Sequence, residues 1–148
     1  TLLELTLVMA IMVTAVSLAA IGYVDIQKRF DVSLAAESID IVLREVQAKS
    51  MSVEYGLHHG LLFATGSQVY ISFTGQVYNA SDTNAKVHYI PQSVEIFNAS
   101  LTNSTGTILF EKLTGSARNH GTLSIRHKLD QSMNAVITIS PEGKISFE

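Results

Sequence analysis

The sequence predicts an α+β protein in which one long N-terminal helix packs against an antiparallel β head. Residues 5–24 carry no charge, and apolar residues then recur at helical spacing to about residue 54. Beyond Gly60 the apolar residues alternate instead, which indicates strands. The head could be a single sheet or a two-sheet sandwich packed on the helix. The expected parts are an apolar half-helix (1–24), an amphipathic half-helix (25–55) and a globular β head domain (60–148).

The first half of the predicted helix has the length of a membrane anchor. Leu5 to Val24 is a stretch of twenty uncharged residues without proline, and Gly22 is its only glycine. A helix of this length spans roughly 30 Å, the hydrocarbon thickness of a bilayer. The chain has no initiator Met, and no basic segment precedes the apolar run. We therefore expect a processed or truncated chain that retained this run.

The second half of the predicted helix is amphipathic. Charged residues appear from Asp25 onward, and apolar residues then recur at intervals of three and four. We expect one helix from about Thr1 to about Glu54, on the order of 80 Å long, with Tyr55-Gly56 as its stop. The apolar positions expected to face the head are Val32, Ala35, Ala36, Ile39, Val42, Leu43, Val46 and Val53.

Eight segments with alternating apolar residues are predicted as strands. Turn residues separate several of them, and Ser140-Pro141-Glu142-Gly143 is a strong hairpin signal. The polar segment Ala80–Ala85 is predicted as a loop. The predicted strands are Leu61–Thr65, Gln68–Thr74, Lys86–Ile90, Val94–Asn98, Thr107–Leu113, Thr122–His127, Ala135–Ser140 and Lys144–Phe147.

Composition excludes several classes of site. The 148 residues include no cysteine, so a disulfide framework and thiolate metal sites are excluded. Ten Lys and Arg stand against thirteen Asp and Glu, for a net charge of -3, which gives no general attraction to nucleic acid.

The start of the chain resembles the type IV pilin family, which includes the type II secretion pseudopilins. The processed N-terminus of that family reads Phe-Thr-Leu-x-Glu and continues into a long apolar run. Thr1-Leu2-Leu3-Glu4-Leu5 matches everything after the Phe. The resemblance implies that an N-methylated residue would precede Thr1. It covers roughly the first 24 residues, and it implies a pilin-like fold with the apolar half-helix in a filament core.

Glu4 is the only charged side chain before Asp25, and the resemblance gives it a role. In the family this glutamate compensates the N-terminal ammonium of a neighbouring subunit, so Glu4 and Thr1 are the expected assembly residues. A lone carboxylate among apolar residues is costly unless it is paired. The alternative is an interfacial glutamate that snorkels to the headgroups of a monomeric anchor. The expected helix-core packing residues are Leu5, Val8, Met12, Ala15, Ala19 and Gly22.

Two departures from the family pattern favour minor pilins, pseudopilins or less typical pili. Many major pilins carry a Gly and a Pro in the apolar run, where the helix melts locally, but Val13 and Ile21 stand here. We expect the helix either to stay more continuous or to unwind near Ala19–Gly22. The disulfide of many Gram-negative pilins is also impossible without cysteine. The number of predicted strands resembles the two-sheet head of the H-type pseudopilin and of related minor pilins implicated in DNA uptake.

The remaining polar signals are weaker. Arg118, Arg126 and Lys128 belong to the only basic concentration and are candidate contacts to DNA phosphates, with a solvated strand and turn as the alternative. The five histidines, which include the adjacent His58-His59, are expected in solvated loops rather than in a metal site. Three matches to the N-glycosylation pattern are expected by chance in a head rich in Ser, Thr and Asn.

The expected function is that of a structural subunit, or pilin, of a type IV pilus-like helical filament at the cell surface. The alternatives are a minor pseudopilin of a type II secretion or DNA-uptake system and a non-polymerising membrane-anchored binding module. The expected partners are copies of the chain and, before assembly, the inner or cytoplasmic membrane. The resemblance adds the pilus assembly machinery and a prepilin peptidase. No cofactor, metal or catalysis is expected, because the sequence has no phosphate loop, nucleophile elbow or HExxH motif.

Overall fold

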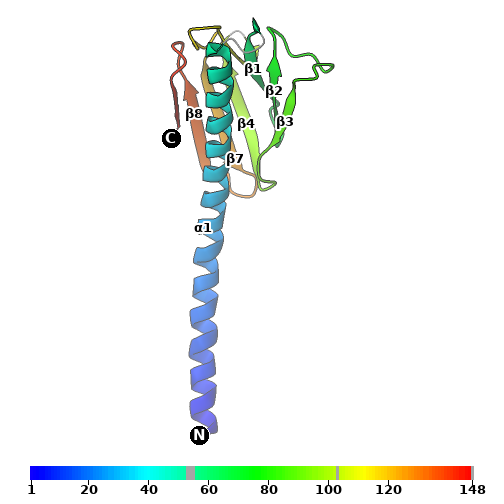
Figure 1. Ribbon diagram of the computed structural model, residues 1–148. Helices are drawn as coiled ribbons and strands as arrows, with labels where there is room; N and C mark the ends of the chain where they lie inside the picture. Colours follow the sequence, from blue (N-terminus) through cyan, green and yellow to red (C-terminus); the bar gives the residue numbers. More distant parts are fainter. Residues whose placement is uncertain (53–55, 103, 148) are drawn as a thin grey trace.

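The computed structural model describes residues 1–52, 56–102 and 104–147. A single helix, α1 (Leu2–Met51), runs from the N-terminus into the head and projects far beyond it (Figure 1). Thr1 caps its start, and Ser52 caps its end by donating its backbone N–H to Ala48 O. The predicted long helix is therefore confirmed. The expected end at Glu54 and Tyr55 lies outside the described residues.

One sheet of the head has four antiparallel strands. Its spatial order is β3-β2-β1-β6, and each neighbouring pair is antiparallel. The strands are β1 (His59–Phe63), β2 (Val69–Thr74), β3 (Lys86–Tyr89) and β6 (Thr107–Phe110).

The other sheet has five antiparallel strands in the order β5-β4-β7-β8-β9. Its strands are β4 (Val94–Leu101), β5 (Ser104–Thr105), β7 (Gly121–His127), β8 (Asn134–Ile139) and β9 (Ile145–Phe147). The alternatives of one sheet or two are thereby decided in favour of two. The hairpin predicted at residues 140–143 joins β8 to β9.

All eight predicted strands are present, but several limits differ by one to three residues. The expected Leu61–Thr65 is β1 (His59–Phe63), and the expected Val94–Asn98 extends to Leu101. Sequence reasoning missed β5, which is only two residues long and pairs with the end of β4. The expected strand Thr107–Leu113 ends at Phe110 instead. The chain turns there because the backbone N–H of Glu111 binds Ser116 O at 2.9 Å. Leu113 has a positive φ of 65°, which a strand cannot accommodate.

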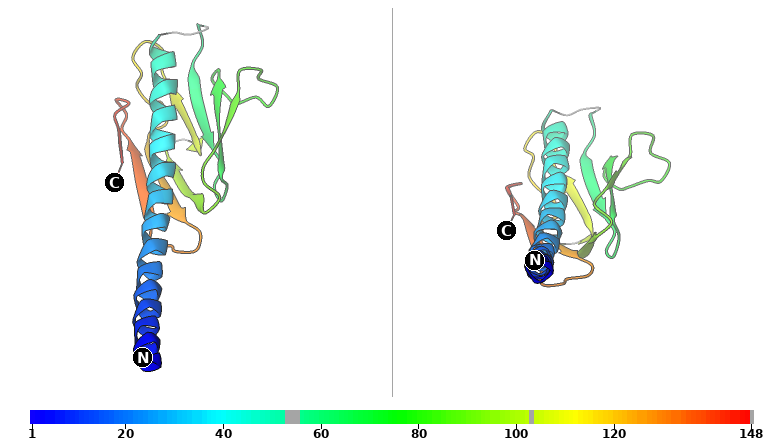
Figure 2. Two further views of the ribbon diagram at one scale, coloured as in Figure 1. Left: turned by 60° about the horizontal axis from the view of Figure 1, so that its bottom comes forward. Right: turned by 90° about the horizontal axis from the view of Figure 1, so that it is seen from below.

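The head-bound part of α1 forms one hydrophobic core with both sheets. The helix contacts chiefly β1, β7 and β8, and it lies against the sheets in each view of Figure 2. Seven of the eight apolar helix positions expected to face the head are buried, and Val53 lies outside the described residues. The sheet side of the core includes Leu61, Tyr70, Ile96, Ile108, Leu123, Ile125 and Ile137.

The expectation of solvated loop histidines is wrong for three of the five, because His88 lies in β3 with its ring stacked on Tyr70 and two others are buried. His59 is buried at the start of β1, where its backbone N–H donates to Ser50 Oγ at 3.1 Å. His127 is buried at the end of β7 and accepts from the N–H of Leu129 through Nδ1 at 3.2 Å. Both histidines therefore fix chain connections inside the fold.

Candidate functional site

The N-terminal half of α1 has no packing partner in the single chain. Every residue from 1 to 27 whose side chain is described is exposed. Figure 1 shows this half as a blue rod standing clear of the head. By length and composition the helix could cross a membrane, and none of its apolar window is buried. The exposed large apolar residues in this half include Leu2, Leu3, Leu5, Leu7, Val8, Met9, Ile11, Met12, Val13, Val16 and Leu18.

Glu4 lies in the first turn of α1, in a reciprocal arrangement with Thr1. The Thr1 ammonium donates to Glu4 Oε2 at 3.2 Å, and the backbone N–H of Glu4 donates to Thr1 Oγ1 at 3.3 Å. This capping box begins the helix. Both side chains are highly exposed, so in water the ion pair stabilises the helix only slightly. The same carboxylate would need a cation far more in an apolar surrounding.

The residues expected to pack in a filament core fall on one stripe of α1. Their spacing alternates between three and four residues, so they share a face of the helix. Leu5, Val8, Met12 and Ala15 are exposed, and a Cβ added to Gly22 would meet no atom within 4 Å. The side chain of Ala19 lies outside the described ones. The backbone is helical through residues 19–22, so the helix is continuous there in the single chain.

Hydroxyl groups in the apolar half-helix bind its own backbone. Thr6 donates to Leu3 O at 2.8 Å, Thr14 to Ile11 O at 2.9 Å, and Ser17 to Val13 O at 2.7 Å. A satisfied hydroxyl costs much less in an apolar medium than a free one. Three polar residues are thereby compatible with lipid or with a neighbouring helix. Sequence reasoning missed these contacts, although Thr and Ser are known to form them within helices.

Two polar contacts hold the base of the head on α1. Lys28 Nζ lies 3.3 Å from Asp25 Oδ1 and 3.5 Å from Asp130 Oδ2, which belongs to the connection between β7 and β8. Ser93 Oγ donates to Asp31 Oδ2 at 2.6 Å. The hydrogen bond to Asp25 is the main cause of the raised pKa of Lys28, with Asp130 adding to it. The helix and the head therefore meet at a fixed height along the helix.

Comparison with solved structures gives two kinds of neighbour. Two crystal forms of the type IV minor pilin FimU from Pseudomonas aeruginosa match with TM-scores of 0.55 and 0.58. They are 16% and 14% identical over 77% and 83% of this chain, and 90% and 92% of FimU. The minor pseudopilin EpsH of the Vibrio cholerae type 2 secretion system matches with a TM-score of 0.57. It is 12% identical over 80% of this chain and 96% of EpsH.

This chain has the type IV pilin and pseudopilin fold. The fold expected from the first residues is thereby confirmed. No protein-family model matches the chain, and no curated protein matches it by sequence. Both neighbours are named as a pilin or a pseudopilin rather than as an enzyme.

The basic residues of this pilin-like head do not form one patch. Arg118 precedes β7 and lies 3.4 Å from Glu111, whereas Arg126 and Lys128 lie at the other end of that strand, roughly 23 Å away. Arg126 Nε donates to Glu95 Oε1 at 2.7 Å, and its guanidinium lies 3.9 Å from the Phe97 ring centroid. Two of the three cations are therefore already opposed by carboxylates.

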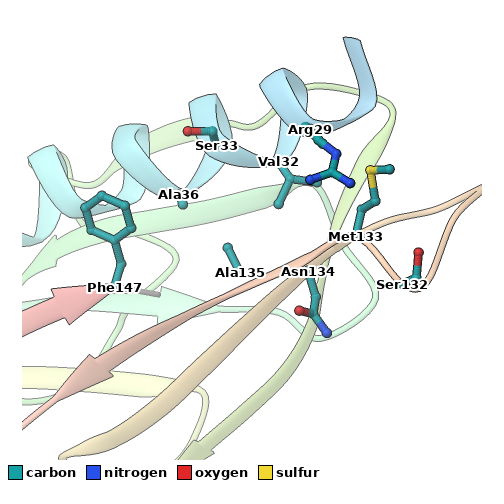
Figure 3. A pocket seen from close by; sticks show the side chains of 9 residues that line it. All are labelled: Arg29, Val32, Ser33, Ala36, Ser132, Met133, Asn134, Ala135 and Phe147. Atoms are coloured by element: carbon teal, nitrogen blue, oxygen red, sulfur yellow. The ribbon is translucent and has the colours of Figure 1, made fainter. Parts of the chain in front are cut away.

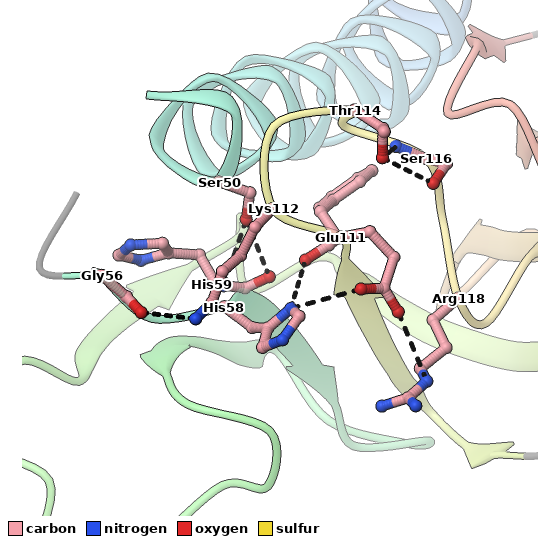
Figure 4. Close-up of polar contacts among 10 residues, drawn as sticks. Ser50, Gly56, His58, His59, Glu111, Lys112, Thr114, Ser116 and Arg118 are labelled. Carbon is pink, nitrogen blue, oxygen red and sulfur yellow. Dashed lines mark hydrogen bonds and ion pairs between the residues drawn. The ribbon is translucent and has the colours of Figure 1, made fainter. Parts of the chain in front are cut away.

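A second polar cluster lies where α1 meets the sheets of the pilin-like head (Figure 4). His58 Nδ1 lies 3.6 Å from Glu111 Oε2, and Arg118 approaches the other oxygen of that carboxylate. Ser50 links the last turn of the helix to the start of β1 through His59. Among the described residues, no group of three or more His, Asp or Glu is placed to hold a metal. The contacts of the cluster therefore join chain segments.

A groove of about 360 Å³ opens between α1 and the strands β8 and β9 of the pilin-like head. Figure 3 shows Val32 and Ala36 from the helix facing Ala135 and Phe147 from the strands. Arg29 lies at the end of the groove near Met133. Among the described residues, no Asp, Glu or His lines the groove. Its described walls offer apolar contacts, with Arg29 as the charged group at one end.

Proposed function

We propose that the chain is a structural subunit, a pilin, of a type IV pilus-like helical filament. The observation that carries the proposal is the exposed apolar half-helix with a single carboxylate at its start. Such a surface cannot remain in water, because exposed apolar area is unfavourable in proportion to its size. Both a bilayer and a bundle of neighbouring helices would cover it. The shared fold with a minor pilin and a minor pseudopilin supports the filament.

In this proposal the half-helix changes its surroundings during assembly. Before assembly, Leu5 to Val24 lie in the inner or cytoplasmic membrane. Afterwards the stripe formed by Leu5, Val8, Met12, Ala15, Ala19 and Gly22 packs on other subunits, where small residues allow close approach. Glu4 pairs with the N-terminus of a neighbour, which sets the axial register. The head forms the outside of the filament at the cell surface.

A second candidate is a minor pseudopilin of a type II secretion or DNA-uptake system. The observation that favours it is the fold, which is shared with a minor pilin and with a minor pseudopilin of a secretion system. Partners would again be copies of related subunits and the assembly machinery, with processing by a prepilin peptidase. The two candidates differ in copy number. Quantitative mass spectrometry of purified filaments separates an abundant pilin from a rare tip subunit.

Replacing Glu4 by alanine tests the assembly step. We expect Glu4→Ala to abolish filaments in electron micrographs, because no carboxylate remains to pair with a neighbouring N-terminus. Membrane insertion and the folded head should persist, since the side chain makes no contact with the head. Glu37→Ala is the matched control, because it removes an exposed carboxylate from the head-bound part of the same helix, and it should leave filaments intact. Wild-type filament yield from Glu4→Ala would contradict the assembly role of Glu4, whereas the absence of filaments from the unaltered chain as well would favour the non-polymerising anchored module.

A further inference from the structure

The turn between β7 and β8, residues 128–133, forms the end of the head nearest to the N-terminal half of α1. It is the orange connection at the lower end of the head in Figure 1 and on the left of Figure 2. Leu129 in this turn is 89% exposed, more than any other large apolar side chain in the described part of the chain. A single exposed apolar side chain is common on protein surfaces, so the position of this turn along α1 decides what Leu129 can contact.

The turn is held in place by its polar groups. Asp130 accepts hydrogen bonds from the Ser132 hydroxyl at 2.6 Å and from the Ser132 N–H at 3.2 Å. The Met133 N–H donates to Asp130 O at 3.1 Å, and the Lys128 N–H donates to Ser93 O at 2.9 Å. These hydrogen bonds fix the backbone on both sides of Leu129, and the turn therefore holds this side chain in an exposed position.

The height of this turn along α1 is fixed. Asp130 contacts Lys28 at 3.5 Å, and Lys28 follows Val24, the last residue of the apolar run, by four positions. Four helical residues rise about 6 Å, and the headgroup region of each leaflet is roughly 5–7 Å thick. The turn therefore lies at the headgroup level whenever the apolar run occupies the hydrocarbon core.

Apolar and aromatic side chains accompany Leu129 at this level. Tyr23, Ile26 and Phe30 of α1 are all exposed, and aromatic residues are typical of the membrane–water interface. The charges near the turn balance, with Lys28, Arg29 and Lys128 against Asp25, Asp31 and Asp130. An anionic lipid is therefore not selected, and the contact depends on apolar insertion.

We propose that the β7–β8 turn is a second membrane contact of the unassembled subunit, with Leu129 entering the boundary between headgroups and acyl chains of a phospholipid bilayer. The inference rests on the membrane-bound state in the proposed function and adds the partner surface of the head. Two contacts, the half-helix and the turn, restrict rotation of the head about the helix axis. Assembly into a filament would release both contacts together.

Tryptophan fluorescence can test this contact directly. The chain has no Trp, so Leu129→Trp introduces a single fluorophore. Leu113→Trp is the matched control, because Leu113 is 72% exposed and its N–H binds Ser50 O at the far end of the head. Ser50 lies 22 residues after Lys28, about 33 Å further along the helix.

The full chain of each variant is reconstituted into phosphatidylcholine vesicles, and flotation establishes insertion. We expect the emission of the Leu129→Trp variant to be blue-shifted relative to that of Leu113→Trp. Its intensity should be largely lost with lipids brominated high on the acyl chain. The Leu113→Trp variant should keep its intensity with these lipids and be quenched by acrylamide.

Two outcomes would contradict the proposal, and they are distinguishable. Flotation with identical emission and quenching for the two variants would overturn the turn contact alone. Failure of the chain to float would overturn the membrane-bound state and this contact with it.

Discussion

Gly106 is one of several glycines in the head at which an added methyl group would collide with a backbone carbonyl oxygen. Its φ is +83°, and a Cβ there would collide with the carbonyl oxygen of Phe63. The Gly106 carbonyl in turn accepts the N–H of Phe63 at 2.7 Å. This backbone contact joins the end of β1 to the chain that enters β6. A side chain would therefore separate two neighbouring strands.

Gly106→Ala should destabilise the protein more than Gly66→Ala does. Gly66 also has a positive φ, of +77°, but a Cβ there would meet no atom within 4 Å. Gly66→Ala should lower the free energy of unfolding by roughly 1 kcal/mol, the cost of a left-handed residue with a side chain. Gly106→Ala adds the collision to this cost. Urea unfolding followed by circular dichroism measures both, and equal losses would contradict the importance of the Phe63 contact.

At the scale of elements, the helix α1 is stabilised by one face only. Ile39 is completely buried in the core, whereas Ile41, two residues on, is 58% exposed. Ile39→Ala should lower the free energy of unfolding by about 2–5 kcal/mol, because it leaves a cavity between the helix and the sheets. Ile41→Ala should change it by less than about 0.5 kcal/mol. A similar loss from both variants in urea unfolding would mean that the helix does not pack as described.

The strand β7 determines where the basic residues lie and which partners they have. It places Arg118 before its start and Lys128 after its end. Pairing with β4 brings Arg126 opposite Glu95. Residues that are close in sequence are therefore separated by the length of an extended strand, and a DNA-binding patch would need cations from elsewhere on the head.

At the scale of the whole molecule, folding and anchoring reside in different halves of α1. No side chain described between residues 1 and 27 is buried. A chain that begins at Asp25 should therefore have the same free energy of unfolding as the full chain, within about 0.5 kcal/mol, when both are unfolded by urea in the same detergent. The same truncation should abolish flotation with vesicles, because one exposed leucine on the head cannot replace the half-helix. A large loss of stability would show that the half-helix supports the head.

The contact between Lys28 and Asp130 ties the β7–β8 turn to α1 just beyond its apolar half. The hydroxyl of Ser132 is the main cause of the lowered pKa of Asp130, followed by the Ser132 backbone N–H, with Lys28 as a lesser contributor. Asp130 therefore stays ionised at neutral pH and keeps its contact with Lys28. The head is thus held at one height above the apolar run.

Local patterns were sufficient to predict the elements. The helix, the apolar half, the eight strand segments and the hairpin at residues 140–143 follow from the spacing of neighbouring residues. Glu4 and the family resemblance also lie within the first 24 residues. The limits of the strands were harder to predict from the sequence. Leu113 has an apolar side chain that suits a strand, and only the turn after Phe110 excludes it from β6.

The sequence by itself determined a long helix with an apolar and an amphipathic half, a β head and a lone carboxylate, because these features are periodic or local. The tertiary structure alone decided that the head has two sheets, that β5 exists, and that His59 and His127 are buried. It also decided that the β7–β8 turn meets α1 at Lys28. These features depend on contacts between residues far apart in the chain, and strand pairing and burial are set by that context rather than by intrinsic propensity.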